Sequence, residues 1–125
     1  MALAEGLWLS LAGWHFARNF EGNFAVLSDI ELWSVAAQGA LMATMEACWK
    51  DGCVLPQVER VLEDTHVLTV PLDGKFHRLL FDDKRWRDGH LVALHAFTNR
   101  RRKLPPGVLV VGEPALEPPR RAPLT

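Results

Sequence analysis

The sequence predicts an α+β domain, with helices near the N-terminus followed by a small antiparallel sheet on which they pack. Between residues 28 and 52, apolar residues recur every three or four positions, the period of a helix with one buried face. Between residues 65 and 97, three segments alternate apolar and polar residues and are separated by turn-forming residues, which is typical of strands. Helices grouped on one side of an antiparallel sheet form the α+β class.

Length and composition predict a single domain with a hydrophobic core, because the chain has 125 residues and is 49% hydrophobic. Cys48 and Cys53 are too few for a disulfide framework and lack the spacing of zinc ligands, so a reduced, cytoplasmic protein is expected. No apolar run approaches the roughly 18 residues of a membrane span. We expect residues 1–11 to form an N-terminal extension, residues 12–111 the domain, and residues 112–125 a proline-rich, disordered tail.

The first half of the chain predicts a strand and then a helical region. Residues 14–20 suit a strand, and residues 21–23 suit a turn. Ser28 begins a capping-box sequence, so the helix is expected to start there, to be weakest at Gly39 and to stop at Gly52. Its apolar stripe favours a packed helix face over a ligand groove. The stripe consists of Ile30, Trp33, Ala37, Leu41, Thr44 and Cys48.

The second half predicts three consecutive strands. Residues 57–63 suggest a short helical turn after a proline. A turn is expected at residues 72–74 and a charged hairpin loop at residues 82–89. The expected strands are residues 65–71, 75–81 and 90–97.

The charge is distributed unevenly along the chain, although the total is only −1. Residues 75–103 carry nine Lys or Arg against three Asp, a net charge of +6, whereas residues 1–74 carry a net charge of −7. We therefore expect the last two strands to present a dense cationic edge, which suggests an anionic partner such as nucleic acid. A solvated charged surface is the alternative.

The same C-terminal region resembles a known family. Residues 93–105 read A-L-H-A-F-T-N-R-R-R-K-L-P, similar to the L-L-H-G-F-x-K-K-x-x-K-T-P signature of RelE/HigB-type toxins in their phage-derived, Gp49-like branch. Residues 75–81, K-F-H-R-L-L-F, resemble a strand of that family. Residues 14–16 and 21–24 are similar to its first strand and to the glycine turn before its first helix. The resemblance covers about residues 12–105.

The resemblance implies a RelE/ParE-like fold and the toxin component of a type II toxin–antitoxin system. Such toxins are metal-independent endoribonucleases, or mRNA interferases, that use no cofactor. Their implied partners are mRNA, the ribosome and a cognate antitoxin, here expected to be a helix-turn-helix protein. The alternative is a non-catalytic binding protein of the same fold, such as a ParE-like gyrase inhibitor or an inactive prophage remnant. The chain has no tyrosine, and its prolines replace the family's C-terminal helix.

Metal-free RNA cleavage needs a base, a cation for the anionic phosphorane and an acid. Arg78 matches the family's strand arginine, and it should share a strand face with Phe76 and Leu80. We expect it to stabilise the phosphorane. His95 and Lys103 are the other catalytic candidates. The expected substrate-binding residues are Lys75, His77, Arg100, Arg101 and Arg102.

Each candidate also has an ordinary structural interpretation. Arg78 could form a salt bridge with Glu63 or Asp82. His95, expected to share a face with Ala93 and Phe97, could be a core histidine. In an ideal strand His77 faces away from Arg78, so the two could serve one site only across a bulge. His66 is a weaker candidate. The five histidines show no metal-binding spacing, so no metal site is expected.

Overall fold

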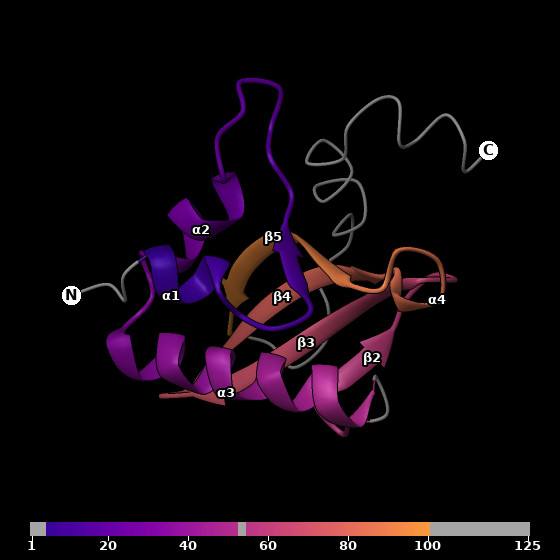
Figure 1. The fold of residues 1–125 in the computed structure, drawn as a ribbon. Helices are drawn as coiled ribbons and strands as arrows, with labels where there is room; N and C mark the ends of the chain where they lie inside the picture. Colours follow the sequence, from indigo (N-terminus) through magenta and orange to yellow (C-terminus); the bar gives the residue numbers. More distant parts are fainter. Residues whose placement is uncertain (1–4, 53–54, 101–125) are drawn as a thin grey trace.

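The computed structural model describes residues 5–52 and 55–100, which form an α+β fold (Figure 1). The expected tail at residues 112–125 and the side chains of Arg101, Arg102 and Lys103 lie outside the described residues. None of the described helices is long and apolar enough to cross a membrane. In chain order the elements are α1 (Glu5–Leu9), β1 (Trp14–Phe16), α2 (Ala25–Ile30), α3 (Val35–Asp51), β2 (Val58–Arg60), β3 (Thr65–Leu72), β4 (Lys75–Asp83), α4 (Arg85–Asp88) and β5 (Leu91–Asn99).

The strands form one five-stranded sheet in the order β1-β5-β4-β3-β2. Strands β2 to β5 follow one another as an antiparallel meander. Strand β1 instead pairs in parallel with β5, with Trp14 opposite Leu91. The sheet is therefore mixed, and the prediction of a wholly antiparallel sheet is wrong at this edge. The parallel pairing is possible because the helices and three strands lie between β1 and β5 in sequence, and parallel neighbours need a long connection.

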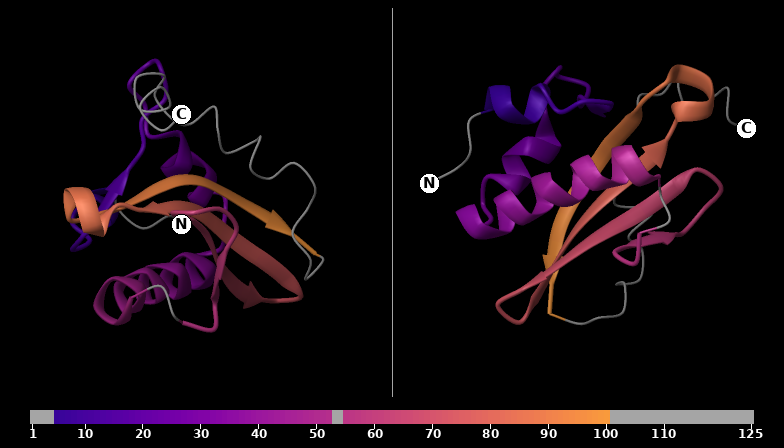
Figure 2. Two further views of the ribbon diagram at one scale, coloured as in Figure 1. Left: turned by 90° about the vertical axis from the view of Figure 1, so that its right-hand side faces the viewer. Right: turned by 60° about the horizontal axis from the view of Figure 1, so that its bottom comes forward.

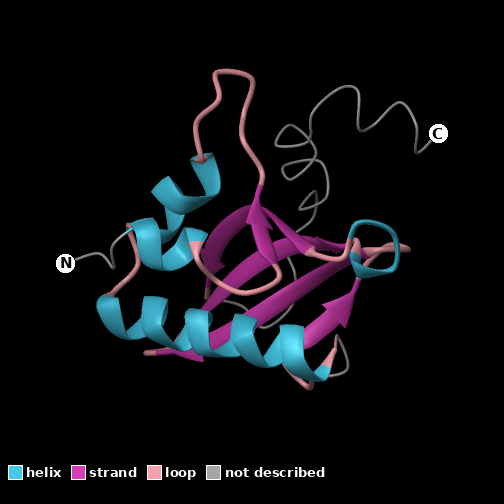
Figure 3. Ribbon diagram, in the orientation of Figure 1, coloured by secondary structure: helices cyan, strands magenta, loops and turns pink. Residues whose placement is uncertain are grey.

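The main hydrophobic core lies between the helices and one face of the sheet. Helix α3 crosses this face, as Figures 2 and 3 show. The Trp14 indole nitrogen donates a hydrogen bond to the backbone oxygen of Met45 at 2.8 Å and so ties β1 to α3. Phe81 of β4 packs edge-on against Trp14, with ring centroids 5.1 Å apart. Burial of these large side chains, each contributing about 1.5–3 kcal/mol, fixes the sheet against the helices.

The helical region begins differently from the sequence prediction. Ser28 lies inside α2, and the chain breaks between Ile30 and Val35. Ser34 has an extended backbone, and its side chain accepts a hydrogen bond from the Ala37 nitrogen, so this serine caps the long helix. The predicted start at Ser28 is wrong because a second serine with cap geometry follows six residues later.

The remainder of the long helix agrees largely with its apolar pattern. Helix α3 continues through Gly39 without interruption and ends at Gly52, whose φ of 82° favours glycine. Five of the six predicted stripe residues are buried, whereas Thr44 is only half-buried and Met45 is buried in its place. A packed helix face is therefore the correct interpretation of this stripe.

Three shorter segments also differ from expectation. Residues 57–63, predicted as a helical turn, contain strand β2, which pairs with β3. The first strand ends at Phe16 rather than continuing to residue 20. Within residues 1–11, α1 places Trp8 in the core at 1% exposure, packed against Phe16. The described part of the expected extension thus contributes to the core.

Candidate functional site

A register shift in the central strand pair determines which candidate side chains share a face. Arg78 of β4 lies opposite Phe97 of β5, and Leu80 lies opposite His95. The pairing then shifts, so that Phe81 lies opposite Ala93. His95 consequently shares a face with Phe97 and Arg78 but not with Ala93. The predicted shared face of His95 and Ala93 is wrong because an irregularity of one residue reverses the alternation of side chains.

Arg78 is held rigidly in the middle of this face. Its Nε donates to Asn99 Oδ1 at 2.9 Å, and its Nη1 donates to Thr69 Oγ1 at 3.0 Å. The guanidinium carbon lies 5.5 Å from the centre of the Phe76 ring, and the residue is 4% exposed. Burial lowers the pKa of Arg78, and the charge of Glu59 raises it. The guanidinium remains charged at neutral pH, because the ordinary arginine pKa lies far above 7.

His95 lies diagonally across the strand pair from Arg78, two positions before Phe97. Diagonal neighbours of this kind have Cα atoms about 7–8 Å apart, within the reach of long side chains. The His95 ring stacks on Phe97, and its Nδ1 lies 3.9 Å from Asp29 Oδ2. Burial lowers the pKa of His95, and Asp29 partly opposes this change. At neutral pH the ring is therefore mainly neutral and able to accept a proton.

His77 and Lys75 lie on the opposite face, on the side of the helices. The prediction that His77 faces away from Arg78 is therefore confirmed. His77 Nδ1 is 3.0 Å from Thr98 Oγ1, and the ring lies 4.8 Å from that of Trp33. Burial, followed by the charge of Lys75, lowers the pKa of His77. His66, the weaker candidate, is a buried side chain stacked on Phe81.

A cavity of about 440 Å³ opens beside His77. It lies where the α2–α3 connection, the β3–β4 turn and the end of β5 meet. Its lining residues are Asp29, Leu32, Trp33, Ser34, Asp73, Lys75, His77, Ala96, Phe97 and Thr98. The predicted site residues are thus divided between two neighbouring places. Arg78 and His95 share one face of the strand pair, and Lys75 and His77 line the cavity, which Phe97 and Asp29 also line.

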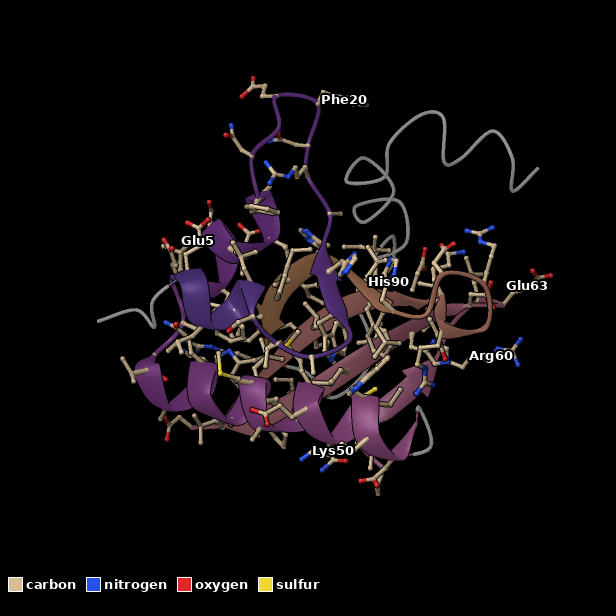
Figure 4. All side chains as sticks on the ribbon, in the orientation of Figure 1. Glu5, Phe20, Lys50, Arg60, Glu63 and His90 are labelled. Carbon is tan, nitrogen blue, oxygen red and sulfur yellow. The ribbon has the colours of Figure 1, made fainter. Side chains whose placement is uncertain are left out.

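Within residues 75–100, the part of the basic stretch that the structure describes, the cations do not form the single edge that the sequence predicts. An antiparallel hairpin places the start of β4 and the end of β5 together, and the residues around α4 at the far end. Figure 4 shows Arg60 and Glu63 at that α4 end of the sheet. There, three cations lie close to carboxylates. These pairs are Lys84–Asp64 at 3.7 Å, Arg85–Asp83 at 2.8 Å and Arg87–Asp88 at 3.5 Å.

At the other end of the hairpin, Lys75 and Arg100 are exposed. We call this the open end, and the end around α4 the paired end. Arg101, Arg102 and Lys103 follow directly in sequence but lie outside the described residues.

The residues that hold the side chains of Arg78, His77 and His95 in place could not be identified from the sequence. Asn99 and Thr69 bind Arg78, while Trp33 and Asp29 contact His77 and His95, respectively. Asn99 and Thr69 become visible only when the strand register is known, since they come from both neighbours of β4. The contact with Asp29 depends on α2 lying against β5.

No protein-family model matches the chain, and no curated protein matches it.

Proposed function

We propose that the protein is the toxin of a type II toxin–antitoxin system, a metal-independent endoribonuclease of the RelE/HigB type. The observation that carries the proposal is the placement of Arg78 and His95 on one face of the central strand pair. The element order also supports it, because a strand, helices and then an antiparallel meander is the order in which the resembling motifs occur. The expected RelE-like topology and the action on ribosome-bound mRNA belong to this proposal.

In the proposed reaction, a general base removes the proton from an RNA 2′-hydroxyl. The 2′-oxygen then forms a bond to the adjacent phosphorus, and the bond from phosphorus to the 5′-oxygen breaks. The departing 5′-oxygen takes a proton from a general acid. His95 is neutral at pH 7 and is assigned the role of the general base. Arg78 stabilises the anionic phosphorane. Lys103 is assigned either the role of the general acid or the binding of the phosphate.

The decisive experiment is single-turnover cleavage of mRNA by the Arg78→Ala variant. Loss of one positioned donor costs about 3–4 kcal/mol, so turnover should fall by about 10²–10³-fold while RNA binding changes little. Arg60→Ala is the matched control, because Arg60 is an exposed arginine of the same sheet. A variant that cleaves as fast as the parent would contradict the role of Arg78.

Arg78 is also part of the fold, so its replacement could prevent folding. Asn99→Ala provides a second test, because it removes the acceptor that orients the guanidinium but leaves the charge. Cleavage should fall about tenfold if one neutral-to-charged hydrogen bond is lost. Unchanged cleavage by folded Asn99→Ala would exclude a role for the positioned guanidinium.

A second candidate function is a non-catalytic binding protein of the same fold, such as a gyrase inhibitor. The burial of Arg78 favours it, because a guanidinium at 4% exposure with hydrogen bonds inside the sheet can be purely structural. Primer extension on cellular mRNA after induction separates the candidates. New 5′ ends indicate ribonuclease activity, whereas growth arrest with DNA breaks and intact mRNA indicates gyrase inhibition.

The proposal also requires toxicity and a neutralising partner. Expression should arrest bacterial growth and translation, and normal growth with folded protein present would count against the proposed toxin function.

The antitoxin is expected to cover the cations at the open end with an acidic or amphipathic segment. Co-purification from the native operon should then recover a small second chain. Recovery of the protein alone would argue against that partner.

A further inference from the structure

The cavity beside His77 opens on the helix side of the strand pair, but it borders the Arg78 face, because Phe97 and Asp29, the two contacts of His95, also line it. It is built from three segments: the α2–α3 connection, the β3–β4 turn and the last residues of β5. Its volume of about 440 Å³ lies within the range of small-molecule sites, about 300–1,000 Å³. Of its polar groups, only Asp29 takes part in the ribonuclease chemistry proposed above, through its contact with His95.

The cavity wall combines aromatic rings with neutral hydrogen-bonding groups. Trp33 and Phe97 supply the rings, and His77, Thr98 and Ser34 supply the polar atoms. A neutral imidazole carries one donor and one acceptor nitrogen, and a hydroxyl can both donate and accept. Such a wall suits a flat, heterocyclic ligand whose edge carries donors and acceptors. His77 Nδ1 already lies 3.0 Å from Thr98 Oγ1, and Ser34 Oγ accepts a hydrogen bond from the Ala37 nitrogen, so a ligand would use the hydrogen-bonding capacity that remains on these groups.

The charges around the cavity are mixed. Lys75 and Asp73 are exposed beside one another at the β3–β4 turn, and Asp29 lies on the α2 side. Arg100 follows the last residue of β5 and is also exposed. Two carboxylates disfavour a ligand that is anionic throughout. The carboxylates suit a ligand whose hydroxyl or amino groups donate hydrogen bonds to them. A single anionic group elsewhere on the ligand could then contact Lys75.

We propose that this cavity binds one nucleotide unit, with its base against Trp33 and Phe97 and its phosphate toward Lys75. Aromatic side chains are common stacking partners for unpaired bases. The carboxylates of Asp29 and Asp73 would accept hydrogen bonds from ribose hydroxyls. The inference rests on the proposed function only in taking RNA as the natural source of the nucleotide.

The test measures binding of nucleoside 5′-monophosphates to the full chain by titration calorimetry, with adenosine, guanosine, cytidine and uridine forms as probes. The matching nucleosides and inorganic phosphate are titrated separately. Lys75→Gln should weaken nucleotide binding about tenfold and leave nucleoside binding unchanged, because only the phosphate loses a charge-assisted contact. Thr98→Val should weaken both. Lys50→Gln is the matched control, since Lys50 lies outside this cavity.

Two results would overturn the inference. One is the absence of binding by all four nucleotides at millimolar concentration. The other is binding that folded Lys75→Gln and Thr98→Val leave unchanged. A short oligoribonucleotide distinguishes the source: if RNA is the natural ligand it should bind more tightly than the monophosphate, and equal affinity would identify a free nucleotide instead. Cleavage without nucleotide binding would refute this inference alone, whereas nucleotide binding without cleavage would refute the proposed function alone.

Discussion

The two ends of the β4–β5 hairpin carry the same kind of residues in different electrostatic environments. At the paired end, each of three cations lies within 3.7 Å of a carboxylate. At the open end, Lys75 and Arg100 are exposed, and Lys75 lines the cavity together with Asp29 and Asp73. The cations of residues 75–100 are therefore divided between the two ends and do not form one surface. The sequence continues from the open end into Arg101, Arg102 and Lys103, so this is the end that we expect to attract an anionic partner over a distance.

The separation of the two ends explains why they act independently. Strands of nine residues at about 3.3 Å per residue span about 30 Å. This span exceeds the Debye length of about 8 Å at physiological ionic strength, so exposed charges at one end barely affect the other. Changes at the open end should therefore alter the binding of nucleic acid, whereas changes at the paired end should alter stability.

In the comparison of the two ends, the largest expected effect is on RNA binding when Arg101 and Arg102, which follow the open end in sequence, are both changed to glutamate (Arg101→Glu and Arg102→Glu). Loss of two phosphate contacts on single-stranded RNA lowers affinity about 15-fold at physiological salt, and repulsion from the new carboxylates brings the total to on the order of 100-fold. The slope of log affinity against log salt concentration should become shallower by about 1.4. Binding measured across a salt series provides the check.

The double variant Arg85→Glu and Arg87→Glu is the matched control for this experiment, because it introduces the same change of charge at the paired end. It should leave the salt slope unchanged. Equal loss of affinity in both variants would show that the whole hairpin acts as one cationic surface, and the comparison between its ends would then be incorrect.

The contrast between the ends also shows what the sequence could predict. The strands of the hairpin and the turn at Asp73 and Gly74 follow from alternation and turn chemistry, which are local properties. The Lys84–Asp64 pair of the paired end could not be predicted, because the two residues meet across the sheet rather than along the chain. The shared face of Arg78 and His95 depends on the register shift near Leu80, which local alternation does not encode.

The next effect concerns stability at the paired end. Lys84 is 2% exposed, and Asp64 is its carboxylate partner at 3.7 Å. Asp64→Asn should lower the free energy of unfolding by about 1–2 kcal/mol, because the buried ammonium group of Lys84 loses its counter-charge. The loss is smaller than for a fully buried pair, because Asp64 is itself partly exposed. Chemical denaturation measures this loss. RNA affinity should stay constant; a parallel loss of affinity in the folded variant would contradict the independence of the ends.

A smaller effect is the response of stability to pH. In the folded protein the pKa of three histidines is lowered from the ordinary value of 6.5, first of all by burial. They are His15, His77 and His95. Their neutral forms are favoured by folding, so the unfolded chain binds more protons just below pH 6.5. Stability should be fully present above that pH and should decrease as the pH falls toward 5.

The pH response can be assigned to each end of the hairpin by mutation. His77 lies beside the cavity at the open end, whereas His15 stacks on His90 near the paired end, with ring centroids 3.8 Å apart. His77→Gln and His15→Gln should each reduce the fall in melting temperature between pH 7.5 and pH 5. If both variants keep the full fall, the pH response comes from other groups.

The smallest expected effect is that of Arg87→Gln on stability. Arg87 and its neighbour Asp88 are both about 40% exposed, and the contact between them is 3.5 Å long. An exposed ion pair of this kind contributes about 0–1 kcal/mol, because water screens the charges and ordering two side chains costs entropy. The variant should therefore unfold within about 0.5 kcal/mol of the parent in denaturant titrations. Asp64→Asn serves as the comparison, since it removes an ion pair at the same end whose cation is buried. If Arg87→Gln lowered the free energy of unfolding as much as Asp64→Asn, solvent exposure would not determine the strength of these ion pairs. The charges of the paired end would then have to act as one network.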